Sequence, residues 1–345
     1  MRMKILYVLV SSTADYYYEQ ALISMMSAKH QMPNCFISLL TDRETVDNLK
    51  DSRNLINKYI SEKKIIDLNK SLSAVQRSRW LKTSMRNIID GDFLYVDVDT
   101  IFASPIDEAL FTDDIMGVPD GNCPLNNHPM KWFIENNLKE ANFDNCINYH
   151  INSGVLFFKD SPLARSFAQK WHQRWEETCK KSICIDQTSL HQAIIDSGNI
   201  LKLLPNYMNA QFGRNINTLS KGVILHYYSS WTDISLYKPA YKMLQDSFLK
   251  KIRENPASKE IQELIQKPKE AFDENTFIMA SDYNEFRNSE FIQNLLQLYN
   301  SADVADKRLY SILERLSRFL RKIYYKTIKL FYPLKRIIRK NAPTS

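Results

Sequence analysis

Residues 93–102 read FLYVDVDTIF, and this stretch decides how the whole chain is interpreted. Four apolar or aromatic residues lead into Asp97 and Asp99, after which the chain becomes apolar again. Side chains two apart on an extended strand point the same way, so the two carboxylates are expected to lie close together. Like charges at close range repel unless a cation joins them, and hard divalent cations prefer oxygen ligands. The stretch therefore predicts a buried strand that ends in a metal site.

The same spacing occurs in Asp90 and Asp92, where an intervening glycine indicates a turn. Two aspartates at this spacing are therefore weak evidence by themselves. The apolar run that leads directly into Asp97 and Asp99 makes this pair the candidate for a metal site. A helix cap or a loop pair is the alternative.

Short apolar runs alternate with amphipathic stretches on both sides of this segment. The alternation is typical of an α/β fold with a mainly parallel sheet and helices on both faces. Ligands of such sheets bind beyond the carboxyl ends of the strands, where the two aspartates stand. The runs predict strands over 4–10, 35–40, 92–99 and 151–159, and helices over 19–29, 77–89 and 163–178.

Strand signals fade after about residue 238, and the later segments have helical spacing. We therefore expect an α/β domain over 1–238, a helical extension over 239–305 and a basic amphipathic tail over 306–345.

The composition is that of an ordinary globular protein, with 44% hydrophobic and 25% charged residues among 345. No run of about 18 apolar residues occurs, so no transmembrane helix is expected. Five cysteines without a CxxC pair argue against a disulfide framework or a structural zinc site and favour a reducing compartment. The nearest two, Cys179 and Cys184, are interpreted as having no role.

The net charge of +7 is concentrated in the tail. Residues 307–340 contain 12 Lys and Arg against one acid, Glu314, so the remainder of the chain is mildly acidic. Apolar residues at helical spacing accompany these cations, a pattern typical of a helix that lies in a membrane interface. The tail therefore predicts binding to an anionic membrane surface rather than to nucleic acid. Packing on the body or on another subunit is the alternative.

Two enzyme chemistries use an apolar strand followed by paired aspartates. In haloacid-dehalogenase-like phosphatases the first aspartate is a nucleophile and the second a general acid/base. Those enzymes need a later acidic motif that typically begins with Gly-Asp, and no Gly-Asp pair follows residue 100. In sugar transfer the aspartates hold a cation that stabilises charge on the departing nucleoside diphosphate.

Further motifs favour sugar transfer. In chain order they read SSTADYYYEQ, SRWLKTSM, LYVDVDT, INSGVLFF, CIDQTSLHQAI, LLPNYMNAQF and VILHYYSSW. The series, over about residues 4–231, resembles the GT-A glycosyltransferases of the family-8 type, which include galactosyl-, glucosyl- and glycogenin-like enzymes. The resemblance implies a Rossmann-like GT-A nucleotide-sugar transferase domain with a mainly parallel sheet, followed by a C-terminal helical appendage.

The resemblance also implies how the donor and its metal are held. Asp97, Asp99 and His226 would be the ligands of Mn²⁺, or of Mg²⁺, on the diphosphate. Asp15 would accept the N–H of a uracil, and Tyr17 would stack on the base. For each single residue the alternative is a structural role, such as a helix cap, a solvated helix face or a packed core side chain.

The remaining implied residues handle the sugar. Asp186 would bind sugar hydroxyls and Gln187 would lie beneath the anomeric carbon, and both are assigned to catalysis. The other donor-binding residues that the resemblance implies are Arg79, Lys82, Asp120 and Asn152.

One stretch departs from the family pattern. After His226 the chain reads YYSSWTDISLYKP, without the family's glycine and without a lysine six residues after the histidine. Lys238, twelve residues on, is the candidate replacement for the diphosphate-binding lysine.

We therefore expect a metal-dependent glycosyltransferase that moves a hexose from a nucleotide-sugar, such as a UDP-hexose, to a saccharide or lipid-linked acceptor. The resemblance implies retention of anomeric configuration. Membrane placement favours surface polysaccharide or lipooligosaccharide synthesis by a cytoplasmic enzyme attached peripherally to the inner face of the membrane. A phosphatase that uses Asp97 and Asp99, or a non-catalytic GT-A binding protein, is the alternative.

Overall fold

The computed structural model describes residues 4–128, 130–211, 216–227, 242–270, 290–301 and 303–340. The chain divides into two compact units, residues 1–285 and 286–345. Lys238 lies outside the described residues, as does the expected domain boundary at the same position. The three expected domains therefore stay a prediction.

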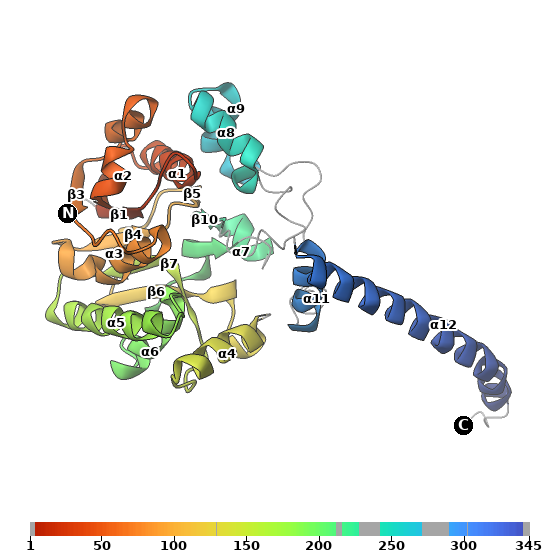
Figure 1. The fold of residues 1–345 in the computed structure, drawn as a ribbon. Coiled ribbons are helices and arrows are strands. Elements are labelled where there is room, and N and C mark those ends of the chain that lie inside the picture. Colours follow the sequence, from red (N-terminus) through yellow and green to blue (C-terminus); the bar gives the residue numbers. More distant parts are fainter. Residues whose placement is uncertain are drawn as a thin grey trace. The chain divides into compact units, whose positions relative to one another are not determined.

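The first unit is built on a seven-stranded sheet in the order β3-β2-β1-β4-β7-β6-β8 (Figure 1). All neighbouring pairs are parallel except those of β7, which runs antiparallel to both β4 and β6. Six strands thus share one direction, and the expected α/β fold with a mainly parallel sheet is confirmed. The strands are β1 (Lys4–Leu9), β2 (Phe36–Asp42), β3 (Glu62–Ile66), β4 (Phe93–Val96), β6 (Ile115–Pro119), β7 (Ile151–Phe158) and β8 (Lys202–Leu203).

Helices cover both faces of this sheet, because both faces of the central strands are apolar. On β1, Ile5 and Tyr7 pack in one core with α1, and Leu6 and Val8 pack in a second core with α3, α5 and α6. The helices α8 and α9 join the first core and contact α1. The bounds are α1 (Tyr17–Gln31), α2 (Arg43–Asp47), α3 (Ala74–Ile88), α4 (Lys131–Ala141), α5 (Pro162–Lys180), α6 (Asp186–Asp196), α7 (Ile216–Lys221), α8 (Asp246–Glu254) and α9 (Lys259–Gln266).

A second sheet of three strands completes the region around the aspartate pair. Its order is β5 (Thr100–Phe102), β10 (Ile224–His226) and β9 (Ala210–Gln211). The strand expected over 92–99 ends at Val96, so Asp97 and Asp99 lie in the turn between β4 and β5 rather than on a strand. Their proximity therefore comes from the turn and not from strand alternation.

Cys179 and Cys184 form a disulfide, so the expectation that they have no role was wrong. The chain turns sharply between α5 and α6, where Ser182 adopts a left-handed backbone with φ of 65°. This turn brings the Cα atoms of the two cysteines to 4.4 Å, a separation that cysteine spacing alone does not reveal.

The second unit contains α11 (Glu290–Asn300) and the long helix α12 (Val304–Lys340), which pack against each other (Figure 1). Exposed apolar side chains recur along α12 at Leu309, Ile312, Leu316, Leu320 and Ile323. Within the described ranges, no helix combines the length and the apolarity that crossing a membrane requires.

Candidate active site

A cavity of about 470 Å³ lies at the carboxyl edge of the main sheet. Nine of the eleven residues expected at the site line it: Arg79, Lys82, Asp97, Asp99, Asp120, Asn152, Asp186, Gln187 and His226. Strand direction explains how they converge. Asp97 and Asp120 directly follow β4 and β6, whereas Asn152 lies at the start of β7, whose reversed direction brings it to the same edge.

The candidate metal ligands converge although His226 is far from the aspartates in sequence. β10 pairs antiparallel with β5 so that His226 lies opposite Thr100, next to Asp99. Its Nε2 is 3.2 Å from Asp99 Oδ1 and 4.0 Å from Asp97 Oδ2. Ligand atoms of the three residues all lie within 4.8 Å of one another. Two carboxylates and one imidazole are a donor set that fits a divalent cation such as Mn²⁺.

Asn209 orients this imidazole, and the sequence analysis missed it. The Asn209 side-chain oxygen lies 2.9 Å from His226 Nδ1, and its amide nitrogen donates to Asn152 Oδ1 at 2.9 Å. Since the amide oxygen can only accept, Nδ1 carries a proton and donates it to Asn209, so Nε2, which faces the aspartates, is the ring nitrogen that could ligate a cation. The stretch LLPNYMNAQF was noted as a family motif, but nothing local in it distinguishes Asn209 from Asn206.

Gly154 keeps the space beside the three ligands open. A Cβ at this position would clash with His226 Cε1 and would lie 2.9 Å from Asp97 Oδ2. The Gly154 carbonyl also accepts the amide of Asp97 at 2.8 Å, which fixes the start of the turn. Glycine is therefore required for the close approach of β7 to these ligands.

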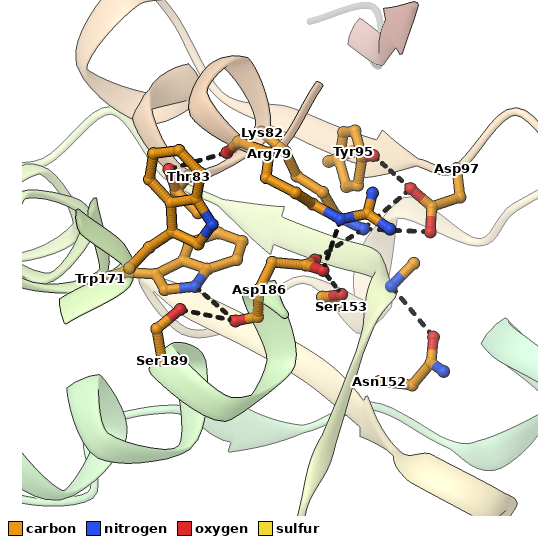
Figure 2. Close-up of polar contacts among 12 residues, drawn as sticks. Arg79, Lys82, Thr83, Tyr95, Asp97, Asn152, Ser153, Trp171, Asp186 and Ser189 are labelled. Carbon is orange, nitrogen blue, oxygen red and sulfur yellow. Dashed lines mark hydrogen bonds and ion pairs between the residues drawn. The ribbon is translucent and has the colours of Figure 1, made fainter. Parts of the chain in front are cut away.

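Two cations lie between the metal ligands and the sugar-side residues (Figure 2). Lys82 Nζ is 3.0 and 3.1 Å from the two oxygens of Asp97 and 3.1 Å from Asp186 Oδ2. Arg79 Nε is 2.9 Å from Asp186 Oδ1, and the Tyr95 hydroxyl donates to Asp97 Oδ1. Both cations come from one face of α3, so this helix links the two halves of the site.

The protonation states follow from these pairs. Burial opposes ionisation of Asp186, but Arg79 and Lys82 outweigh it and hold the pKa of its carboxyl well below the ordinary value. Burial also opposes ionisation of Asp99, yet His226 lowers its pKa. The pKa of His226 is raised, because Asp99 and Asp97 outweigh the effect of burial. The carboxylates are therefore ionised and available as ligands or hydrogen-bond acceptors at neutral pH.

The sugar-side residues Asp120 and Asn152 are held rigidly. Asn152 Nδ2 donates to Asp120 Oδ1 at 2.9 Å, and His128 Nε2 is 3.2 Å from Asp120 Oδ2. Gln187 lines the same cavity from the first turn of α6. The Asp186 side chain also accepts the Ser153 hydroxyl at 2.6 Å, so β7 and α6 are joined at the cavity floor.

Asp15 and Tyr17 are not among the residues that line this cavity. The Asp15 carboxylate holds its own loop, accepting from Ser11 Oγ at 2.6 Å, from Ser12 N at 2.8 Å and from Tyr17 N at 3.1 Å. The Tyr17 side chain is 49% exposed. Their role in binding a base stays a prediction.

An arginine from beyond the expected α/β domain anchors the same loop. Arg253 of α8 donates to the carbonyls of Thr13 and Asp15 and forms an ion pair at 2.7 Å with the buried Glu19. Its guanidinium also lies 4.6 Å from the centre of the Tyr16 ring. The helix α8 is thus part of the support of this loop.

Comparison with solved structures identifies the fold. The apo structure of the bifunctional glycosyltransferase WbbM matches with a TM-score of 0.51 and 12% identity, over 77% of this chain and 51% of that chain. This chain therefore spans about half the length of WbbM. Two further matches are the galactosyltransferase LgtC in complex with donor and acceptor sugar analogues (TM-score 0.47, 11% identity, 74% of this chain and 97% of that chain) and apo mouse xyloside xylosyltransferase 1 (0.43, 12%, 66% and 98%).

No protein-family model matches the sequence, and no curated protein does. At these identities the similarity concerns the fold alone. The mostly parallel sheet, the turn with two aspartates after β4 and the match to WbbM show that the chain adopts the fold of GT-A glycosyltransferases.

Proposed function

We propose that this protein is a metal-dependent glycosyltransferase that moves a hexose from a nucleoside diphosphate sugar, such as a UDP-hexose, to a saccharide or lipid-linked acceptor. The observation that carries the proposal is the convergence of Asp97, Asp99 and His226 in a cavity that also contains sugar-side polar residues. A cation site beside buried carboxylates and amides is what transfer from a diphosphate sugar requires.

Each part of the cavity has a distinct task in this reaction. A divalent cation held by Asp97, Asp99 and His226 would neutralise the charge that develops on the departing diphosphate. Lys82 contacts both carboxylate oxygens of Asp97 and fixes their position. Arg79 holds Asp186, whose carboxylate would accept sugar hydroxyls. Because burial and ion pairs fix these groups before the donor binds, little reorganisation is needed during transfer.

The two sugar-side carboxylates favour front-side attack by the acceptor hydroxyl. Asp186 is engaged by Arg79, Lys82 and Ser153, and Asp120 by Asn152 and His128. A carboxylate with all its charge in ion pairs and hydrogen bonds is a poor nucleophile. Retention, which the family resemblance implies, would then proceed with the leaving diphosphate assisting the acceptor, and with Gln187 beneath the anomeric carbon.

Donor binding and turnover together test the proposal. Wild-type protein is expected to bind UDP-glucose or UDP-galactose only with Mn²⁺ or Mg²⁺, measured as a rise in melting temperature, and to hydrolyse the bound donor slowly. Binding without hydrolysis or transfer would indicate the non-catalytic binding protein instead. Release of phosphate from sugar phosphates, with no binding of UDP-sugars, would indicate the phosphatase.

We also propose that α12 attaches the enzyme to the anionic inner face of a membrane, which would suit a lipid-linked acceptor in surface polysaccharide or lipooligosaccharide synthesis. The support is an exposed apolar stripe on a helix whose sequence carries 12 Lys and Arg against one acid over 307–340. Apolar insertion together with cation attraction is the usual basis of interfacial binding.

Vesicle sedimentation tests this attachment. The protein is expected to bind vesicles of phosphatidylglycerol and phosphatidylcholine, but not phosphatidylcholine alone. At about 1 kcal/mol for each cation, replacing four of them is expected to weaken binding by about 10³-fold. The four are Arg315, Arg318, Arg321 and Lys322, each changed to Gln. Lys250→Gln with Lys259→Gln, on α8 and α9, is the matched control. Equal binding to both vesicle types would refute the proposal.

A further inference from the structure

Two buried histidines behind the cavity form a contact that the proposed reaction does not use. His150 lines the cavity and is 4% exposed, whereas His191 of α6 lies behind it and is fully buried. Their Nδ1 atoms are 3.2 Å apart, which is hydrogen-bond distance. Because the Nδ1 of His150 is turned to His191, its Nε2 is the ring nitrogen left for a ligand in the cavity.

The contact permits two proton arrangements, and burial distinguishes them. One Nδ1 must carry the proton that is shared with the other. Among the described residues, His191 Nε2 is buried without a hydrogen-bond partner. If that nitrogen carried a proton, a buried N–H would be left unsatisfied, which is rare in folded proteins. His191 therefore carries its proton on Nδ1 and donates it to His150, and His150 carries its own proton on Nε2.

The charges around the cavity favour the same arrangement. The carboxylates of Asp120 and Asp186 both act on the His150 ring, and an N–H directed into an acidic cavity is favoured over a lone pair. Burial lowers the pKa of His150 to about 4, and it lowers that of His191 to about 3. Both rings are therefore neutral at physiological pH, and the direction of the N–H is fixed.

We propose that His150 Nε2–H is a fixed hydrogen-bond donor to a hydroxyl oxygen of the transferred sugar, set in that tautomer by His191. This inference rests on the proposed function and adds a residue that selects the sugar. Asp120 and Asp186 can only accept hydrogen bonds from hydroxyl groups, whereas His150 supplies a donor on the same side. The cavity lining as a whole has four carboxylates against the two cations Arg79 and Lys82, which suits a neutral sugar and disfavours a uronic acid.

Nitrogen NMR of histidine-labelled wild-type protein tests the tautomers without any ligand. We expect His150 to be protonated at Nε2 and His191 at Nδ1, assigned by comparison with His150→Gln. The reverse assignment, with His150 protonated at Nδ1, would overturn the proposal whatever the enzyme's activity.

Binding measurements test the contact with sugar. Affinities for UDP, UDP-glucose and UDP-galactose are measured with Mn²⁺ by calorimetry. His150→Leu is expected to weaken binding of the preferred UDP-sugar about 10-fold, the effect of one lost hydrogen bond, with UDP unchanged. His150→Gln keeps an N–H donor and is expected to recover most of that loss. His30→Gln, an exposed histidine on α1, is the control.

The outcomes separate the two proposals. Equal losses for UDP and UDP-sugar, or a Gln variant no better than the Leu variant, would overturn the role of His150 alone. Wild-type protein that binds none of the three probes would overturn the proposed function and this inference with it. If His150→Leu does not fold, the binding data for His150→Gln and the tautomers assigned in wild-type protein still test the role of His150.

Discussion

In the cavity the cations Arg79 and Lys82 each lie within 3.1 Å of a carboxylate, whereas the cations of α12 over residues 307–322 outnumber the acids there and are exposed. The cavity charges come from elements far apart in sequence and are fixed by burial. The charges of α12 come from one continuous helix, and the Arg318–Glu314 pair at 3.2 Å is exposed at its surface. The first region is preorganised for a small ligand, and the second is suited to a broad, charged surface. Chemistry and attachment should therefore be separable by mutation.

The strongest test of this separation removes the charge of the metal site. Asp97→Asn with Asp99→Asn removes both negative charges from the ligand group, so Mn²⁺-dependent transfer is expected to fall by at least about 10³-fold. Steady-state kinetics and Mn²⁺ calorimetry measure the loss. The control is Asp90→Asn with Asp92→Asn, at two aspartates that have the same spacing but lie in a turn outside the cavity. This variant is expected to leave transfer and Mn²⁺ affinity unchanged. Unchanged turnover in the first variant would remove the metal from the reaction.

Acid is expected to lower the free energy of unfolding, because burial keeps the His150 ring neutral in the folded protein at a pH where the unfolded chain protonates it. Above about pH 6.5 the ring is neutral in both states and contributes nothing. As the pH falls towards 4, the unfolded chain takes up the proton first, so the free energy of unfolding declines by up to about 3 kcal/mol. Urea unfolding between pH 7 and 4 measures this decline, which His150→Gln should reduce. If the free energy of unfolding fell equally with pH in wild-type protein and in His150→Gln, this role of His150 would be contradicted.

A smaller effect on the metal site is expected when His226 keeps its place but loses the residue that orients its ring. Asn209→Ala removes the acceptor of the His226 Nδ1 proton, and the affinity for Mn²⁺ is expected to fall about 10–100-fold. Asn206→Ala, in the same short helix (Asn206–Asn209), is the matched control. Metal titrations that do not distinguish the two variants would show that Asn209 is not needed for the metal site.

The smallest effect on catalysis is expected from the tail. The variant with four Gln substitutions at Arg315, Arg318, Arg321 and Lys322 changes surface side chains alone, so turnover of a soluble acceptor should stay within about twofold. Assays with a soluble and with a vesicle-bound acceptor make the comparison. A large loss with the soluble acceptor would mean that chemistry and attachment are coupled.

The sequence predicted the parts of this site that local patterns encode. Apolar runs located β1, β2, β4 and β7, and the run before Asp97 and Asp99 placed this pair at the carboxyl edge of the sheet. Asp120 and His226 were implied by the family resemblance, and both line the same cavity. Partners set by tertiary pairing were missed. The choice of Asn209 as the acceptor for His226 depends on the pairing of β9 with β10. The direction of β7 was also not predictable, because an apolar run reads the same for a parallel and an antiparallel strand.

The reversed direction of β7 has a consequence for how donor preference can change. Residues 120–150 leave the sheet at the end of β6 and return to the same edge at the start of β7, and they supply His128, Phe133 and His150 to the cavity wall. This segment begins and ends at the carboxyl edge of the sheet, so its sequence can be replaced without altering the order of the strands. Exchange of this one segment during evolution could thus change which sugar the cavity accepts, while the turn with Asp97 and Asp99 stays the same.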